Sequence, residues 1–195
     1  MMWNQRYLFY FIAVFLFFNV PGRLHGKGGV STHNGVSQGM MLYSGSFTHG
    51  TFIPREYSRG DMNISPHFIW EKAPANTKSF ALICVDQSAG NFVHWIIFNI
   101  PPQIHEFSKG FRPPKDILQG QNGFREQNNW QGPQPSQGSG EHNYLFTLYA
   151  LDVPELRTTD GSRLQEGATY EQVTAACEGH ILEEAYLLGK YSYME

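Results

Sequence analysis

Three short segments, far apart in the chain, carry side chains that could together bind a small anion. They contribute Asp86, His94, and then His142 and Tyr144, which follow a Gly-Pro-x-Pro stretch at 132–135. Each segment lies where an apolar run meets a polar one, which is where folds commonly display functional groups. An acid, two imidazoles and a phenol offer donors and acceptors to a phosphate or carboxylate. Because no recognisable motif places a nucleophile beside them, the pattern predicts a binding protein rather than an enzyme.

The spacing indicates how these side chains could meet. If the apolar runs 79–86 and 92–100 pair as a hairpin, Asp86 comes within reach of His94 and can fix its tautomer. His142 and Tyr144 are two residues apart, so on an extended segment both point to one face. Gly132 lets a ligand approach the main chain closely and can offer a backbone N–H. A lone histidine at the start of a buried strand is more often structural than functional. The expected proximity of Asp86 makes the functional interpretation of His94 about as strong, so both stay open here.

Two other classes of function compete with anion binding. Asp86, His94 and His142 could form a two-histidine, one-carboxylate metal site and support a hydrolase or metal-dependent enzyme. Against this, the chain has no Gly-x-Ser-x-Gly elbow and no phosphate-binding loop. In the third hypothesis the pocket is vestigial, and the long polar segment from Pro101 to Glu141 is a protein-interaction surface. A segment of that length is functional or disordered more often than it is an idle connection.

The elements that would position these residues are mainly β-strands. Twenty glycines, eleven prolines and 15% aromatic residues favour a loop-rich β protein over a helical bundle. Prolines punctuate the apolar runs, and the longest runs lack alternation, as expected of strands covered on both faces. The predicted strands are Met40–Phe47, His67–Trp70, Ser79–Asp86, Phe92–Ile100 and Tyr144–Leu151.

One helix is predicted near the C-terminus. Thr169 is a good N-cap, and Glu171 in the first turn complements the helix dipole. Apolar residues then recur at helical spacing to Cys177, and we expect the helix to end between Ile181 and Glu183. Residues 185–193 could continue this helix or form a last strand, and a strand over 186–191 is the favoured alternative.

The N-terminal residues are typical of an export signal. An almost unbroken apolar run covers 7–20 after a single Arg6, and it is shorter than the ~20 residues of a membrane span. We therefore expect a signal peptide or retained anchor over 1–26, a flexible leader over 27–39 and one domain over 40–195. The protein would then be periplasmic or secreted, or anchored to a membrane by its N-terminus.

The charged residues limit the possible partners, and the sequence around the cysteines indicates their structural role. A net charge of −3 without a basic run argues against a nucleic-acid partner. Cys84 lies in an apolar run and is expected to behave as a core residue, and a disulfide to Cys177 is the less favoured alternative. No cofactor is expected.

The order of several motifs resembles the phosphatidylethanolamine-binding protein family, in its bacterial, Raf-kinase-inhibitor-like branch. The resemblance covers roughly 40–193, and the ordered combination is specific although each piece alone is weak. The motifs are Ser65-Pro66-His67-Phe68-Ile69-Trp70, Ala73 to Leu82, His94-Trp95, Asn99-Ile100-Pro101, Gln119 to Phe124, Gly132-Pro133, His142 to Asp152, Gly179 to Ala185 and Gly189-Lys190-Tyr191.

The resemblance implies a β-sandwich with a C-terminal helix and long Pro/Gly-rich loops. It also implies one pocket for phosphate-type groups, such as phospholipid headgroups or other phosphorylated or carboxylate ligands. Family members are mostly binding or inhibitory proteins, so a kinase or protease partner is implied as well. By position, the pocket residues are Asp86, His94, Gly132, His142 and Tyr144, with walls shaped by Pro66 and Pro133.

The chain departs from the family pattern at three places. Asp-Pro-Asp becomes Asp86-Gln87-Ser88, Gly-Pro-x-Pro-Pro ends in Ser136, and His-Arg-Tyr carries Asn143 in place of arginine. These changes remove an acid, two rigid prolines and a cation. We therefore expect a pocket that is less polar and less braced than is usual in the family.

Overall fold

The structure is a computed structural model that describes residues 39–125 and 128–193. The predicted signal peptide and all but the last residue of the predicted leader lie outside the described residues. In the part of the chain that is described, no helix is long and apolar enough to cross a membrane.

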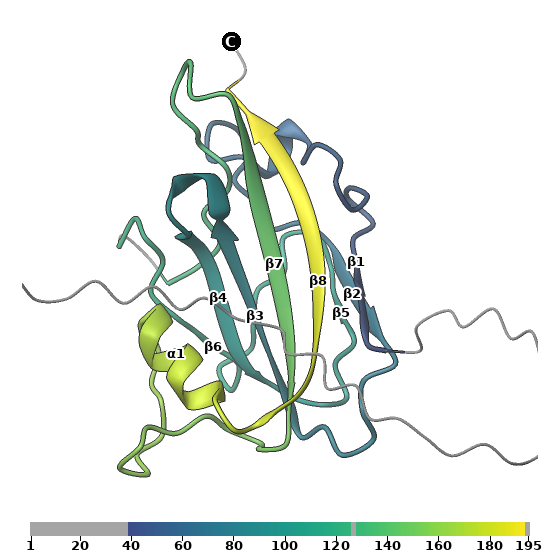
Figure 1. Ribbon diagram of the computed structural model, residues 1–195, viewed down its shortest axis with the longest axis vertical. Coiled ribbons are helices and arrows are strands. Elements are labelled where there is room, and N and C mark those ends of the chain that lie inside the picture. Colours follow the sequence, from purple (N-terminus) through teal and green to yellow (C-terminus); the bar gives the residue numbers. More distant parts are fainter. Residues whose placement is uncertain (1–38, 126–127, 194–195) are drawn as a thin grey trace, which may run out of the picture. The chain divides into compact units, whose positions relative to one another are not determined.

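Two antiparallel sheets form the core of the described residues (Figure 1). The larger sheet has the strand order β6-β4-β3-β7-β8 and the smaller one the order β1-β2-β5. The strands of the larger sheet are β3 (Ser79–Asp86), β4 (Phe92–Ile100), β6 (Leu118–Gln119), β7 (Glu141–Leu151) and β8 (Ile181–Ser192). Those of the smaller sheet are β1 (Met41–Tyr43), β2 (Phe68–Glu71) and β5 (Glu106–Phe107). The predicted mainly-β, sandwich-like fold is confirmed.

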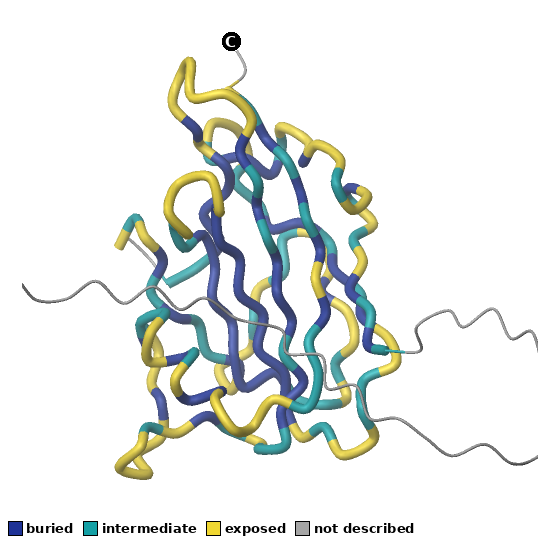
Figure 2. The backbone as a smooth tube through the Cα atoms, in the orientation of Figure 1, coloured by how far each residue is buried: buried dark blue, intermediate teal, exposed yellow. Residues whose placement is uncertain are grey.

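The continuous apolar strands are buried on both faces because two separate clusters cover them. One cluster fills the space between the sheets and includes Phe68, Trp95 and Phe146. The other lies on the opposite face of the larger sheet, where α1 (Tyr170–Cys177) packs through Val173 and Cys177. All eight residues of β3 are accordingly buried, and Figure 2 shows the central strands as the most deeply buried part of the chain.

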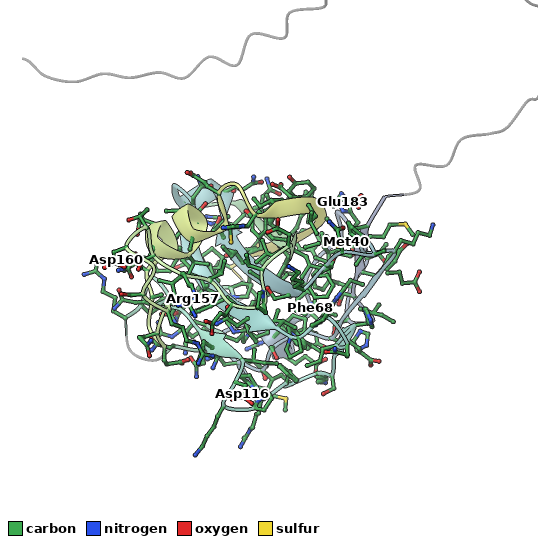
Figure 3. The ribbon with its side chains drawn as sticks, turned by 90° about the horizontal axis from the view of Figure 1, so that it is seen from below. Met40, Phe68, Asp116, Arg157, Asp160 and Glu183 are labelled. Carbon is green, nitrogen blue, oxygen red and sulfur yellow. The ribbon has the colours of Figure 1, made fainter. Side chains whose placement is uncertain are left out.

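The interior and the edge of the sandwich can be followed in Figure 3. Phe68 of β2 lies among the buried rings, with its centroid 4.9 Å from that of Phe146 on the facing sheet. At the edge, the Met40 N–H donates to a Glu183 carboxylate oxygen at 2.7 Å, which ties the start of the smaller sheet to β8.

The helix prediction is correct at its start and wrong at its end. Thr169 caps α1 in a reciprocal capping box with Gln172, as its residue type predicted. The helix stops at Cys177, since Glu178 is already extended and Gly179 takes a φ of +78°. A left-handed residue ends the helix, and β8 begins at Ile181, so the final strand is much longer than 186–191. The first predicted strand is shorter than expected and covers only Met41–Tyr43.

The long Pro/Gly-rich segment packs on the sheets, as its aromatic residues predicted. Phe107 is fully buried and stacks on Phe111, with ring centroids 4.1 Å apart. Trp130 is buried and stacks on Phe146 at 5.9 Å. The segment therefore supplies a wall of the interior and places its loop residues beside the end of the larger sheet.

The two cysteines are both buried and free. Cys84 belongs to the cluster between the sheets and Cys177 to the cluster under α1. The predicted core role of Cys84 is confirmed.

Candidate functional site

The end of the larger sheet gathers the predicted polar residues around one cavity of about 240 Å³. β3 pairs with both β4 and β7, and Asp86 stands directly opposite Tyr144 in the register. We call this space the histidine cavity. It is lined by Asp86, Ala89, Phe92, His94, Phe124, Gln134, Pro135, Ser136, His142 and Tyr144.

A β-bulge determines where His94 points. In the β3–β4 ladder Cys84 pairs with Trp95 and Val85 with Val93, so His94 is an extra residue without an opposite partner. A bulge of this kind bends the strand and re-aims a side chain. It brings the His94 ring to 5.0 Å from the Tyr144 ring, centroid to centroid, in an edge-on arrangement.

Asp86 is the hub of the polar network. Its Oδ2 accepts a hydrogen bond from His142 Nδ1 at 2.6 Å, and its Oδ1 accepts one from the Ser88 N–H at 2.9 Å. Burial, followed by the charge of Asp86 and by hydrogen bonding to it, raises the Tyr144 pKa well above its usual range. The phenol is therefore neutral, and it positions Asp86.

His94 is held as a neutral ring with a defined tautomer. Its Nδ1 donates to the Gln131 carbonyl oxygen at 2.5 Å, and that oxygen can only accept. The rings of Phe92 and Phe124 lie 5.3 and 5.8 Å from the imidazole. Burial is the largest cause of a lowered His94 pKa, and hydrogen bonds and the charge of Asp86 oppose it. In the neutral ring, Nε2 is therefore a hydrogen-bond acceptor.

His142 presents its other nitrogen to a loop serine. Its Nδ1 is held by Asp86, while Nε2 lies 3.0 Å from Ser139 Oγ. The Ser139 hydroxyl is also within hydrogen-bonding distance, 2.7 Å, of the Ser136 carbonyl oxygen, to which it can donate. Asp86, His94 and His142 are buried, whereas Ser139 is exposed. The loop over 136–140 thus closes on the one edge of the imidazole that Asp86 leaves open.

Comparison with known proteins places this arrangement in a family. The sequence profile described as phosphatidylethanolamine-binding protein matches residues 43–192. A UPF0098 protein of Methanothermobacter thermautotrophicus is 40% identical over 163 residues, a match that covers 78% of this chain and 98% of the relative. A UPF0098 protein of Aquifex aeolicus is 38% identical over 157 residues, covering 78% of this chain and 88% of the relative. The chain belongs to the phosphatidylethanolamine-binding protein family.

Solved structures agree with this assignment. A crystal structure of CT736 from Chlamydia trachomatis, described as a putative phosphatidylethanolamine-binding protein homologue, has a TM-score of 0.71 and 32% identity. It covers 81% of this chain and 100% of its own. Escherichia coli YbcL, described as a member of the mammalian family, also has a TM-score of 0.71 and covers 80% of this chain and 99% of its own. At 21% identity YbcL supports the fold alone.

Three of the residues that the family resemblance assigned to the pocket do not line the histidine cavity. Pro66, Gly132 and Pro133 are buried and are not among its lining residues, whereas Gln134 to Ser136 form part of its wall. The Gly132 N–H donates to Asn63 Oδ1 at 2.8 Å, so it is engaged within the protein. A Cβ at position 132 would lie 1.9 Å from the Tyr57 carbonyl oxygen, so a residue larger than glycine would clash there.

Three residues to which the sequence analysis assigned no role in the pocket, Ser88, Gln131 and Ser139, also belong to the site. Ser88 Oγ accepts the Asn143 N–H at 3.0 Å, so Ser88 ties the turn after β3 to β7 and braces Asp86. This contact restores part of the bracing that the Asp86-Gln87-Ser88 departure was expected to remove. The Asx pattern of Asp86 with the residue two positions on could have signalled it. Gln131 and Ser139 act through tertiary contacts that no sequence pattern indicates.

A metal centre is not supported by the arrangement. Among residues 39–125 and 128–193, no group of three or more His, Cys, Asp or Glu side chains is placed to hold a metal ion. Asp86 and His142 are instead joined by a direct hydrogen bond between Oδ2 and Nδ1.

Proposed function

We propose that the histidine cavity binds a phosphate-type anion, such as a phospholipid headgroup or another phosphorylated small molecule, without transforming it. The observation that carries the proposal is the convergence of His94 and His142 on one small cavity. In each ring, Nδ1 is engaged by the protein. The Nε2 atom of each ring is therefore left for a ligand, once the Ser139 hydroxyl moves away from His142 Nε2.

The two imidazoles select the protonation state of the ligand. Neutral His94 offers an acceptor at Nε2, which suits a P–OH group or an ammonium. His142 donates from Nε2 when its ring is protonated, and the Asp86 carboxylate is in place to hold the other N–H. A hydrogen phosphate or a phosphoethanolamine carries both kinds of partner. A fully deprotonated anion offers only acceptors and would leave the His94 lone pair unmatched.

The size of the cavity limits the ligand to a headgroup. About 240 Å³ accommodates a phosphate with a short substituent and leaves an acyl chain outside. Each charge-assisted hydrogen bond contributes ~1.5–3 kcal/mol, and part of that is lost to the cost of association. Weak binding of a bare headgroup follows, strengthened where Phe92 and Phe124 contact an apolar substituent.

Titration calorimetry with phosphoethanolamine and with inorganic phosphate tests the proposal. We expect His142→Ala to weaken binding at least about tenfold. His180→Ala is the matched control, because His180 is an exposed histidine whose Nδ1 also contacts a carboxylate, that of Asp152. Equal affinities of the His142→Ala and wild-type proteins for both ligands would refute the assignment.

We also propose that the protein is exported and that it acts by binding and inhibiting a partner protein, such as a kinase or protease. The apolar run over 7–20 supports export, and family membership supports a binding role. Cell fractionation of the full chain tests the first statement, and a cytoplasmic location would contradict it.

A second candidate function rests on the series Asp86–His142–Ser139. The carboxylate, the imidazole and the hydroxyl are joined at 2.6 and 3.0 Å in the order used by serine hydrolases. In that function Ser139 Oγ would attack an ester carbonyl and pass its proton to His142 Nε2. The imidazolium would return that proton to the departing alcohol as the ester C–O bond breaks, and a water activated in the same way would release the acyl group as a carboxylic acid. This function ranks second because Ser139 is exposed and its hydroxyl has the Ser136 carbonyl as an alternative acceptor. Labelling of wild type but not Ser139→Ala by a fluorophosphonate would place it first.

A further inference from the structure

A second and larger cavity lies beside Trp95 and does not share a lining residue with the histidine cavity. Its volume is about 520 Å³, within the range of small-molecule sites. Loops at 62–65, 110–113 and 129–130 surround it, together with Gln119 of β6. We call it the arginine cavity, and it is lined by Met62, Asn63, Ile64, Ser65, Trp95, Gly110, Phe111, Arg112, Pro113, Gln119, Asn129 and Trp130.

Arg112 gives this cavity a single, unbalanced charge. It is the only charged residue among those that line the cavity. It is exposed, and within the described residues it has no hydrogen-bond or ion-pair partner. The neighbouring acid Glu166 accepts the Gln119 main-chain N–H but does not line the cavity. A guanidinium without a carboxylate partner favours a carboxylate or phosphate oxygen pair from a ligand.

The remaining walls favour an apolar body attached to that anion. The Trp95 indole N–H donates to Gln119 Oε1 at 2.9 Å, and the Trp130 indole N–H donates to the Tyr57 carbonyl at 3.1 Å. Both indoles therefore offer carbon surface to a ligand. Phe111, Met62 and Pro113 extend this apolar lining. Rings and thioethers around one cation are suited to an amphipathic anion rather than to a bare ion.

One polar atom among the lining residues lacks a partner. Ser65 Oγ is buried and makes no hydrogen bond. A buried hydroxyl without a partner costs free energy that a ligand donor or acceptor can recover. The side-chain amides beside it are already engaged, since Asn63 Nδ2 donates to Gln131 Oε1 at 3.1 Å and Gln131 Nε2 donates to Asn129 Oδ1 at 2.8 Å. The amide network thus braces the wall of which Ser65, with its unpartnered hydroxyl, is part.

We propose that the arginine cavity is a second ligand site, which takes an organic anion with a carboxylate or phosphate head and a ring-containing apolar body. Arg112 binds the head and the Trp95–Trp130 wall holds the body. The site is separate from the anion site proposed above, because the two cavities have no lining residue in common.

The test is calorimetry and two-dimensional NMR of the full chain with 3-phenylpropanoate, its neutral analogue 3-phenyl-1-propanol, and phenyl phosphate. We expect the two anions to shift the indole N–H signals of Trp95 and Trp130. Arg112→Gln should weaken both anions about tenfold by removing the charge-assisted bonds. Lys115→Gln is the matched control, because it removes one exposed positive charge three residues away that does not line the cavity.

The outcomes separate the two sites. His142→Ala should leave 3-phenylpropanoate binding unchanged. The proposal for the arginine cavity can therefore hold even if the proposed anion binding in the histidine cavity is refuted. Binding of 3-phenylpropanoate that is equal in Arg112→Gln and wild type would overturn the proposal. So would equal affinity for 3-phenyl-1-propanol, or anion-induced shifts confined to His94 and His142. Binding of phenyl phosphate but not of 3-phenylpropanoate would support the site and assign a phosphate head.

Discussion

The histidine cavity and the arginine cavity differ in how their polar groups are satisfied before any ligand arrives. In the first, Asp86 accepts hydrogen bonds from His142 and from the Ser88 N–H, and each histidine has one nitrogen fixed by the protein. In the second, Arg112 is without a partner among the described residues and most of the wall is carbon. The first is organised for recognition of particular protonation states, whereas the second relies on charge and apolar area. Under the two proposals, one fold provides two kinds of anion recognition on either side of the same loop.

That loop, over 129–132, supports both cavities. Asn129 and Trp130 line the arginine cavity, and the main-chain carbonyl of Gln131 fixes the tautomer of His94. Gly132 closes the segment against Tyr57. A change that displaces this loop should therefore damage both sites, while changes on either side of it should affect one.

The largest expected effect comes from Gly132→Ala. The added Cβ would meet the Tyr57 carbonyl oxygen at 1.9 Å, so the loop must move. We expect a loss of about 2–4 kcal/mol in the free energy of unfolding. Binding of phosphate and of 3-phenylpropanoate should weaken together. Urea denaturation and calorimetry measure these effects.

Gly60→Ala is the control for that substitution. Its Cβ would find no atom closer than 3.9 Å, and its φ is not positive. Stability of Gly132→Ala within 0.5 kcal/mol of the Gly60→Ala variant, as is usual for a neutral surface change, would show that the loop is not tightly fixed.

pH should separate the two cavities. Sulfate keeps its charge between pH 5.5 and 8, so a change in its affinity over this range reports on the protein. Because protonation converts His94 Nε2 from an acceptor to a donor, we expect sulfate to bind the histidine cavity more tightly as pH falls from about 6.5 towards the lowered pKa of His94. Arg112 stays charged throughout, so 3-phenylpropanoate should bind with constant affinity. A sulfate affinity that is flat with pH would contradict the assigned role of the imidazoles.

Burial lowers the pKa of His94, and this makes the stability of the ligand-free protein depend on pH. The folded-state pKa lies below the unfolded value of about 6.5, so the unfolded chain binds the proton first. The contribution of His94 is fully present above that pH and is lost as pH falls towards the folded-state value. Urea denaturation of His94→Gln at several pH values should give a shallower decline than wild type.

The smallest expected effect is that of Ser139→Ala. Removing the hydroxyl frees His142 Nε2, whose present neighbour is Ser139 Oγ at 3.0 Å. We expect phosphate affinity to rise about two- to fivefold, since one weak hydrogen bond no longer competes with the ligand. Binding of 3-phenylpropanoate should not change. A fall in phosphate affinity would indicate that Ser139 donates to the ligand.

Much of the site could be predicted from the sequence because it depends on local patterns. Apolar runs defined β3, β4 and β7, and the two-residue periodicity placed His142 with Tyr144. Antiparallel pairing of neighbouring runs then brought Asp86 and His94 to one cavity. The expectation that Asp86 fixes the His94 tautomer was wrong, because Asp86 hydrogen-bonds His142 and the Gln131 carbonyl holds the His94 ring. The Thr169 cap was equally local. The end of the helix could not be predicted from local sequence, because a glycine such as Gly179 can continue, cap or interrupt a helix. Pairing with the long strand β7 favoured an early start of β8.

The sequence by itself determined the long central strands β3, β4 and β7, and that an acid, two imidazoles and a phenol come near one another, because these follow from side-chain periodicity and chain connectivity. The short strands β5 and β6 carry no such pattern and were not predicted. Tertiary structure alone decided which atoms are available to a ligand. The bulge that turns His94, the engagement of the Gly132 N–H by Asn63 and the approach of Ser139 to His142 each join residues far apart in sequence or depend on exact register. Hydrogen bonds act over about 3 Å, and no pattern of residue types carries information at that resolution.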